Sequence, residues 1–230
     1  MGQRFPSISD RHRAFIEAQK IFFVASAAPE GRVNVSPKGM GTLRVLGPDE
    51  VAYLDCTGSG TETRAHLVGP GDGRLTLMFC AFEGPPLVLR LYGRGQSLMR
   101  GTPEYDALLP RFDEIPGARQ IVRLAVDLVQ ASCGMGVPLF YYREDRRDLV
   151  RHWERQGPDR LREYWGARNA ASIDGLPTGF EPAEMAATQW RRPAGTRRPA
   201  RGFRTCRPGG PGGLPPPEAI LLDRRSPASG

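Results

Sequence analysis

Residues 20–39 read KIFFVASAAPEGRVNVSPKG, and this stretch decides the fold class. Its first part, residues 21–28, is rich in β-branched and aromatic side chains, which favour strands over helices. The turn residues Pro-Glu-Gly follow at 29–31, and Val33 and Val35 then alternate with polar neighbours. Two such runs around a short turn predict a β-hairpin.

The same alternation recurs along the chain, most clearly in residues 42–55 (TLRVLGPDEVAYLD) and 118–132 (ARQIVRLAVDLVQAS). Helical patterns stand only between or outside these runs. They follow Ser9-Asp10, cover TETRAHLV at 61–68 and begin again at Pro103. Strands in successive hairpins predict a nearly closed antiparallel sheet and argue against a doubly wound one. We therefore expect a mainly β domain, a six-stranded antiparallel barrel with flanking helices.

The C-terminal quarter of the chain divides into two parts. Residues 146–169 have a helical pattern interrupted at Gly157-Pro158, which predicts two helices packed on the barrel, with Trp153 and Trp165 as core anchors. From residue 179 onward Arg, Pro and Gly dominate without apolar periodicity. Such a composition cannot bury enough surface to offset the entropy of ordering it. We expect a folded domain at 1–178 and a disordered tail at 179–230.

The basic character of the chain lies mostly in this tail. Residues 179–230 hold nine Arg and four acidic residues, so they account for +5 of the formal net charge of +7. The remaining body is nearly neutral, and the arginines of the tail are not regularly interleaved with aromatic residues that could stack on bases. We expect no nucleic-acid partner.

The cysteine pattern and hydropathy narrow the class of protein further. The four cysteines show neither CxxC spacing nor a nearby histidine cluster, which predicts no zinc site and no disulfide framework. No apolar run approaches the roughly 18–20 residues of a membrane span, and the N-terminus lacks the apolar core of a signal peptide. We expect a soluble, cytoplasmic protein with reduced thiols and no membrane partner. Cys133 is expected to be a small buried thiol, and His66 either a surface histidine or one satisfied within the fold.

Several segments, in their order and spacing, resemble the pyridoxamine 5′-phosphate oxidase-like flavin-binding split barrels. The resemblance spans about residues 15–177. The segments are KIFFVASAAPEGRVNVSPKG, VAYLDCTGSGTET, RLTLMFCAFEGPP, LRLYGRG, SCGMGVP and NAASIDGLP. The resemblance implies a split β-barrel that binds FMN at the interface of a homodimer and oxidises or reduces a small molecule. The alternatives are a deazaflavin or haem cofactor, and a protein that binds its cofactor without turnover.

The resemblance places the flavin ring along residues 34–39, with Val35, Ser36, Pro37 and Lys38 as its binding residues. Pro37 would fix the local path of the chain. Lys38 would bring positive charge to the side of the ring where negative charge collects on reduction. The alternative for Lys38 is a solvated lysine at the end of a strand. No residue is assigned as a catalytic acid or base.

The resemblance places the phosphate at the loop TGSGTET, with Thr57, Ser59, Gly60 and Thr63 as ligands. Hydroxyls and glycine-freed backbone amides suit an anion. The alternative is a plain connecting loop rich in small residues. Relatives carry a Lys or Arg near Thr63, whereas this chain has Glu62 and Thr63 there. Arg64 and Arg74 are therefore the candidates to replace the missing positive charge.

Overall fold

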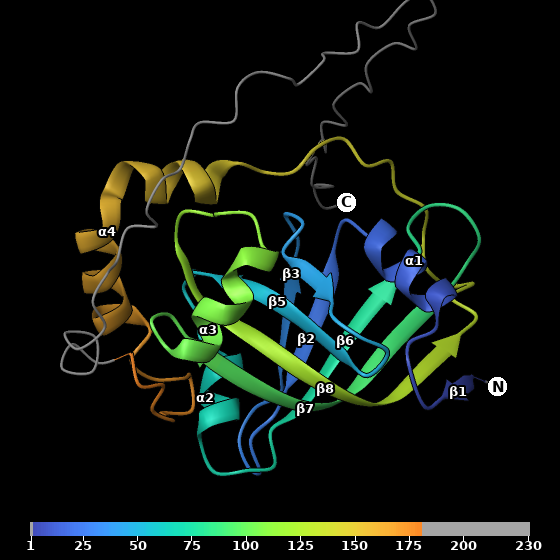
Figure 1. The fold of residues 1–230 in the computed structure, drawn as a ribbon, viewed down its shortest axis with the longest axis horizontal. Coiled ribbons are helices and arrows are strands. Elements are labelled where there is room, and N and C mark those ends of the chain that lie inside the picture. The colour runs from blue at the N-terminus through green and yellow to red at the C-terminus, as the bar shows by residue number, and fades with distance from the viewer. Residues whose placement is uncertain (1, 181–230) are drawn as a thin grey trace, which may run out of the picture. The chain divides into compact units, whose positions relative to one another are not determined.

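The computed structural model describes residues 2–180, which form one curled antiparallel sheet with helices around it (Figure 1). The sheet order is β3-β2-β6-β7-β8-β5-β4, and β1 pairs with β8. The eight strands are β1 (Gln3–Phe5), β2 (Phe22–Ser26), β3 (Asn34–Lys38), β4 (Leu43–Val45), β5 (Glu50–Cys56), β6 (Arg74–Cys80), β7 (Val88–Met99) and β8 (Ala118–Ser132).

The mainly β antiparallel class is confirmed, but the expected count of six strands was two too low. β1 has three residues, and an alternation over three residues is too short to separate a strand from a loop, whereas β4 lies in the expected hairpin at residues 42–55. The two ends of the strand order, β3 and β4, do not pair with each other within the described residues. The sheet is therefore a half-barrel that stays open along this side.

The two longest strands, β7 and β8, carry the curvature of the sheet. Their register shifts between Tyr92 and Gly93, which is a bulge that bends the pair. A Cβ at Gly93 would lie 1.8 Å from the carbonyl oxygen of Ala125, so this close approach requires glycine. The inner face of the sheet is packed with apolar side chains such as Val24, Leu77 and Leu91, each 0 % exposed.

Four helices border the sheet: α1 (Asp10–Ala18), α2 (Glu62–Val68), α3 (Pro103–Leu108) and α4 (Asp148–Arg168). The expected N-terminal signals are confirmed, because Oγ of Ser9 accepts from the His12 amide at 3.2 Å and α3 begins at Pro103. No helix in residues 2–180 is long and apolar enough to cross a membrane.

Helix α4 consists of two helical stretches that meet at Gly157, whose φ of 76° lies in the left-handed region. Both tryptophans of α4 are buried and bond to one residue of the barrel. Nε1 of Trp153 donates to the carbonyl of Thr57 at 3.1 Å, and Nε1 of Trp165 donates to the hydroxyl of the same threonine at 2.7 Å. The two expected helices and their tryptophan anchors are thus confirmed.

The chain after α4 returns to the domain beside α2 (Figure 1). Phe180, two residues past the expected domain boundary, is fully buried, and its ring lies 5.6 Å from that of Trp165. The guanidinium of Arg64 lies 5.0 Å from the same phenyl ring. The prediction of a disordered tail falls, apart from Gly179 and Phe180, on residues 181–230, which lie outside the described residues.

Candidate functional site

The open strand β3 has one polar and one apolar face, because its side chains alternate. Asn34, Ser36 and Lys38 are half-buried on the inner side, whereas Val35 and Pro37 are exposed on the outer side. The four residues expected to bind the ring are therefore divided between two faces. Only Ser36 and Lys38 extend toward the interior of the half-barrel.

Lys38 is not a solvated lysine, because it belongs to a buried ionic cluster. Its Nζ donates to Oδ1 of Asp55 on β5 at 2.7 Å, and Nε of Arg119 on β8 donates to Oδ2 at 2.8 Å. The side chains of Asp55 and Arg119 are each 3 % exposed and that of Lys38 is 22 % exposed. Gln120 adds a hydrogen bond to Oδ2 at 2.8 Å. The cluster joins two cations to one carboxylate.

The charge of the cluster determines the protonation of Asp55. Burial alone would raise the pKa of this carboxyl. The charges of Arg119 and Lys38, with hydrogen bonds from Lys38 and Gln120, outweigh burial and hold the pKa of Asp55 well below its ordinary value. Asp55 is thus a carboxylate, and the cluster keeps a net positive charge on the inner side of β3.

A second network of neutral groups connects β3 to α2. Nδ2 of Asn34 donates to the hydroxyl of Thr63 at 3.1 Å and to that of Ser26 at 3.3 Å. Oγ of Ser36 donates to Oδ1 of Asn34 at 2.9 Å. His66 is 2 % exposed, and its Nδ1 lies 3.0 Å from the Ser26 hydroxyl. His66 is therefore satisfied inside the fold and is not a surface histidine.

The loop before α2 contains one hydroxyl that is already occupied and one that has no partner. Thr57 is fully buried, and its hydroxyl donates to the carbonyl of Gly117 at 2.7 Å while accepting from Trp165. Thr61, which the sequence did not single out, is 3 % exposed, and its hydroxyl has no hydrogen-bond partner within the described residues. Such a buried orphan calls for an explanation, for example an absent ligand.

The rest of this loop is open to solvent. Ser59 and Gly60 are exposed, and a Cβ at Gly60 would meet nothing within 4 Å. None of the backbone amides from Gly58 to Thr63 donates a hydrogen bond within residues 2–180. The loop therefore presents unpaired donors beside an unpaired buried hydroxyl.

The positive charge beside this loop comes from a residue that the sequence did not indicate. Nη2 of Arg119 donates to the carbonyl of Gly60 at 2.8 Å, and its Nη1 donates to Oδ1 of Asn169 at 2.8 Å. Arg119 thereby connects the ionic cluster under β3 with the loop. The only sequence signal was an arginine near the start of the long strand pattern at 118–132.

Neither arginine proposed from the sequence supplies this charge to the loop. The guanidinium of Arg64 turns to the carbonyl of Thr178 and to the hydroxyl of Ser97. Arg74 pairs with Asp72 at 2.9 Å on the surface. Their positions follow from tertiary contacts that sequence spacing does not reveal.

Cys133 and Cys56 differ in how far they are exposed to solvent. Cys133 is exposed, so the expectation of a buried thiol was wrong. It follows the end of β8, in a loop that no element covers closely enough to bury it. Cys56 lies at the end of β5, where burial and the charge of Asp55 raise its pKa to about 12 and keep it a thiol.

Comparison with known proteins identifies the family. The family model described as pyridoxamine 5′-phosphate oxidase matches residues 8–133. The chain is 38 % identical over 193 residues to the pyridoxamine 5′-phosphate oxidase family protein ustO of Aspergillus flavus, covering 75 % of this chain and 76 % of that protein.

Three solved structures resemble the fold more distantly. HupZ of Group A Streptococcus has a TM-score of 0.41 and 18 % identity, over 53 % of this chain and 91 % of its own. An FAD-binding protein of Mycobacterium smegmatis has a TM-score of 0.40 and 10 % identity, over 56 % and 97 %. An FMN-binding protein of Syntrophomonas wolfei has a TM-score of 0.38 and 17 % identity, over 56 % and 85 %.

These structural similarities are too weak to add to the assignment, which rests on the family model and the fungal relative. Both cover more than half of the chain, and the curled antiparallel sheet agrees with them. The chain belongs to the pyridoxamine 5′-phosphate oxidase family.

Proposed function

We propose that this protein is an FMN-dependent oxidoreductase that works as a homodimer on a small-molecule substrate. The observation that carries the proposal is the buried, unpartnered hydroxyl of Thr61 in a loop of unpaired amides, with Arg119 beside it. Family membership supplies the class of cofactor. Whether FMN fits depends on how well the side chains and backbone groups described above match its phosphate and its ring.

The phosphate end of FMN fits the loop at 57–63. The Thr61 hydroxyl and the free amides from Gly58 to Thr63 are donors for phosphate oxygens. Arg119 provides positive charge at Gly60 in place of the basic residue expected near Thr63. Of the ligands first predicted, Ser59 and Gly60 remain in this assignment, whereas the hydroxyl of Thr57 is engaged with Gly117 and Trp165.

The ring end fits the free edge of β3. In the part of the chain that the structure describes, β3 pairs with β2 alone. The backbone groups on its other edge are therefore not used by the sheet and can match the donors and acceptors of the ring. Lys38 is held in place by Asp55 at 2.7 Å. A lysine fixed in this way keeps its position when a ligand binds, which is the pre-organisation that electrostatic stabilisation needs.

When bound, FMN supplies the hydride or electron transfer, and the chain supplies position and charge. Lys38 and Arg119 together outweigh the charge of Asp55, so the inner side of β3 favours negative charge nearby. The β3–α2 network of Asn34, Ser36 and Thr63 holds the strand edge in a fixed position relative to the loop.

The homodimer is supported by apolar surface that the single chain leaves uncovered. Val33 and Val35 on the outer face of β2–β3 are 69 % and 62 % exposed. Large side chains of the segment after β8 are also exposed, with Tyr141 at 94 % and Leu139 at 72 %. Surfaces of this kind usually mark contacts with another molecule. We propose that a second copy of the chain packs against this surface.

The visible absorption spectrum of the purified full-length chain tests this proposal. The expected result is a flavin spectrum, with FMN identified by mass spectrometry after release from the protein. A haem spectrum or a deazaflavin mass would contradict FMN as the cofactor. A chain that stays colourless after incubation with FMN would contradict flavin binding altogether.

A further inference from the structure

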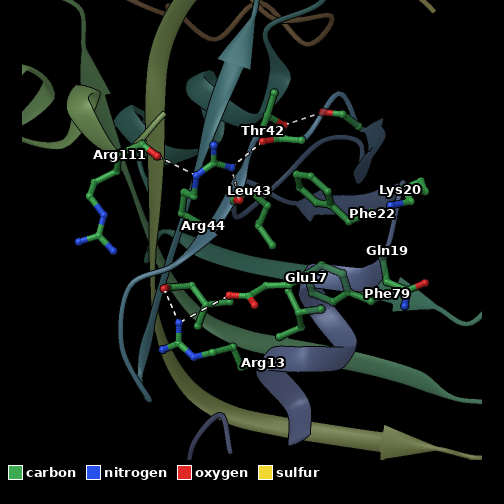
Figure 2. A pocket seen from close by; sticks show the side chains of 14 residues that line it. Arg13, Glu17, Gln19, Lys20, Phe22, Thr42, Leu43, Arg44, Phe79 and Arg111 are labelled. Carbon is green, nitrogen blue, oxygen red and sulfur yellow. Dashed lines mark hydrogen bonds and ion pairs between the residues drawn. The ribbon is translucent and has the colours of Figure 1, made fainter. Parts of the chain in front are cut away.

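A separate cavity of about 380 Å³ lies between α1, the turn at residues 39–42 and β4 (Figure 2). It lies within the size range of small-molecule sites, which are mostly apolar with a few polar groups that fix orientation. Its lining meets the segment expected to carry the flavin ring only at Gly39, and contains none of the ring-binding residues 35–38 or of the phosphate loop.

The floor of this cavity is apolar. Ile16 of α1, Phe22 of β2 and Phe79 of β6 are 2 %, 4 % and 1 % exposed, and they line the cavity with parts of their side chains. Leu43 of β4 is partly buried against the same core. A floor of this kind accepts a flat hydrocarbon body and offers nothing to a fully hydrated ion.

The rim of the cavity is cationic. In the view of Figure 2, Arg13 and Arg44 lie on one side and Lys20 on the other, with Phe22 between them. Arg44 is fixed by hydrogen bonds to the carbonyls of Gly41, Leu43 and Arg111. Arg44 is thus a rigid source of positive charge rather than a flexible surface arginine.

Arg13 and Lys20 retain donors for a ligand. Nη1 of Arg13 donates to the carbonyl of Val45 at 2.9 Å and lies 3.7 Å from Glu17, which leaves its other guanidinium nitrogens without bonds. Nζ of Lys20 lies 5.7 Å from the centre of the Tyr142 ring and makes no ion pair within residues 2–180. Glu17 is the one acidic side chain in the lining, and Asp113 outside it pairs with Arg44 at 3.3 Å. Against these two carboxylates stand Arg13, Lys20 and Arg44, so the rim keeps an excess of positive charge.

The turn that forms one wall is held in an unusual conformation. Met40 (φ 59°) and Gly41 (φ 63°) are both left-handed, and Met40 is the one non-glycine residue with positive φ in residues 2–180. Thr42 closes the turn with its amide and its hydroxyl, both donating to the carbonyl of Gly39. Backbone strain of this kind clusters at ligand sites.

We propose that this cavity binds a small organic carboxylate with a flat apolar body. The apolar floor takes the body, Arg13 takes the carboxylate at the rim, and Lys20 adds positive charge from the opposite side. This inference goes beyond the proposed flavin function and does not depend on it, because the cavity and the flavin residues are separate sets.

Benzoate is the probe, and titration calorimetry with the full-length chain is the measurement. The expected result is saturable binding of benzoate, with benzamide, its uncharged counterpart, binding at least about tenfold more weakly because it loses the charged hydrogen bonds. Inorganic phosphate, which has no apolar body, is expected not to displace benzoate. Equal affinity for benzamide, or displacement by phosphate, would overturn the assignment.

Variants locate the probe. Lys20→Gln is expected to weaken the binding of benzoate by up to about fivefold, because it removes the charge of one partly exposed side chain. Arg111→Gln is the matched control, because Arg111 lines the cavity with its carbonyl while its guanidinium turns away (Figure 2). Amide shifts of Thr42 and Leu43 in NMR spectra on adding benzoate would support the site. Unchanged affinity in both Lys20→Gln and Arg13→Gln, or no binding by the parent chain, would contradict it.

Discussion

The ammonium of Lys38 lies 2.7 Å from Oδ1 of Asp55, a carboxylate whose side chain is 3 % exposed. This pair connects the open strand β3 to β5, and Arg119 extends it to the loop before α2. Because the charges are buried, removing one partner leaves the others without compensation. The candidate site is therefore also a point of structural sensitivity.

Asp55→Asn is expected to lower the free energy of unfolding by about 3–5 kcal/mol, because it leaves the buried Arg119 without its counter-charge. Denaturant unfolding followed by circular dichroism measures this. Asp72→Asn is the matched control, since Asp72 pairs with Arg74 and Arg94 on the surface, and we expect little change there. Equal effects of the two variants would contradict the role of the cluster.

The stability of the protein should fall at acid pH in a range set by Asp55. Its pKa in the folded chain lies below its ordinary value of 3.8, so its contribution is fully present above that pH. The contribution is lost as the pH falls further, through the folded pKa, where the buried carboxylate takes up a proton. Between about pH 5 and pH 2, the free energy of unfolding should fall more steeply with decreasing pH for the parent chain than for Asp55→Asn. Parallel curves would argue against this assignment.

Thr61→Val should weaken FMN binding about tenfold, because a hydroxyl that donates to a charged phosphate is lost. Stability should not fall, since this hydroxyl has no hydrogen-bond partner within residues 2–180. Affinity for riboflavin, which lacks the phosphate, should stay the same. Fluorescence titration with both flavins measures the difference.

Thr57→Val serves as the control for Thr61→Val and should behave in the opposite way. It removes a hydroxyl bonded to Gly117 and Trp165, which should cost about 1–3 kcal/mol of stability. FMN binding by the folded variant should be retained. A loss of FMN affinity specific to Thr57→Val would show that the phosphate ligands are wrongly assigned.

Lys38→Met should lower the midpoint potential of the bound flavin by about 30 mV, the equivalent of a tenfold change in a two-electron equilibrium. The reason is the loss of positive charge near β3, while Arg119 still compensates Asp55. Lys20→Met removes the same charge at a site separate from the flavin residues and should leave the potential unchanged. Equal potentials in both variants would remove the role given to Lys38.

Val35→Lys should convert the proposed dimer to a monomer, because it places charge on an apolar outer face where Val35 is 62 % exposed. Light scattering after gel filtration measures the mass. An unchanged circular dichroism spectrum would show that the fold is retained. A parent chain that is already monomeric would contradict the dimer itself.

Local patterns in the sequence predicted most of the fold. The hairpin at residues 20–39, the Ser9 cap and the break at Gly157 each depend on neighbouring residues, and each is present in the structure. The strand count was too low in part because the three-residue strand β1 carries little local pattern.

The candidate site was less predictable because its contacts join distant parts of the chain. Arg119 reaches Asp55 across 64 residues, and Thr57 meets Trp165 across 108 residues. Sequence alone indicated Lys38 and the loop at 57–63 as candidate flavin-binding residues, and this assignment stays a prediction. The sequence could not show that Thr57 is already occupied, that Thr61 is free, or that Arg119 supplies the charge.

The central claim is that FMN binds with its phosphate at Thr61 and its ring at β3. Titration of the cofactor-free chain with FMN and with riboflavin, followed by quenching of flavin fluorescence, tests it most directly. The expected result is saturation at one FMN per chain, with riboflavin binding distinctly more weakly because the phosphate contacts are lost. Equal affinity for the two flavins, or no saturable quenching by FMN, would contradict the claim.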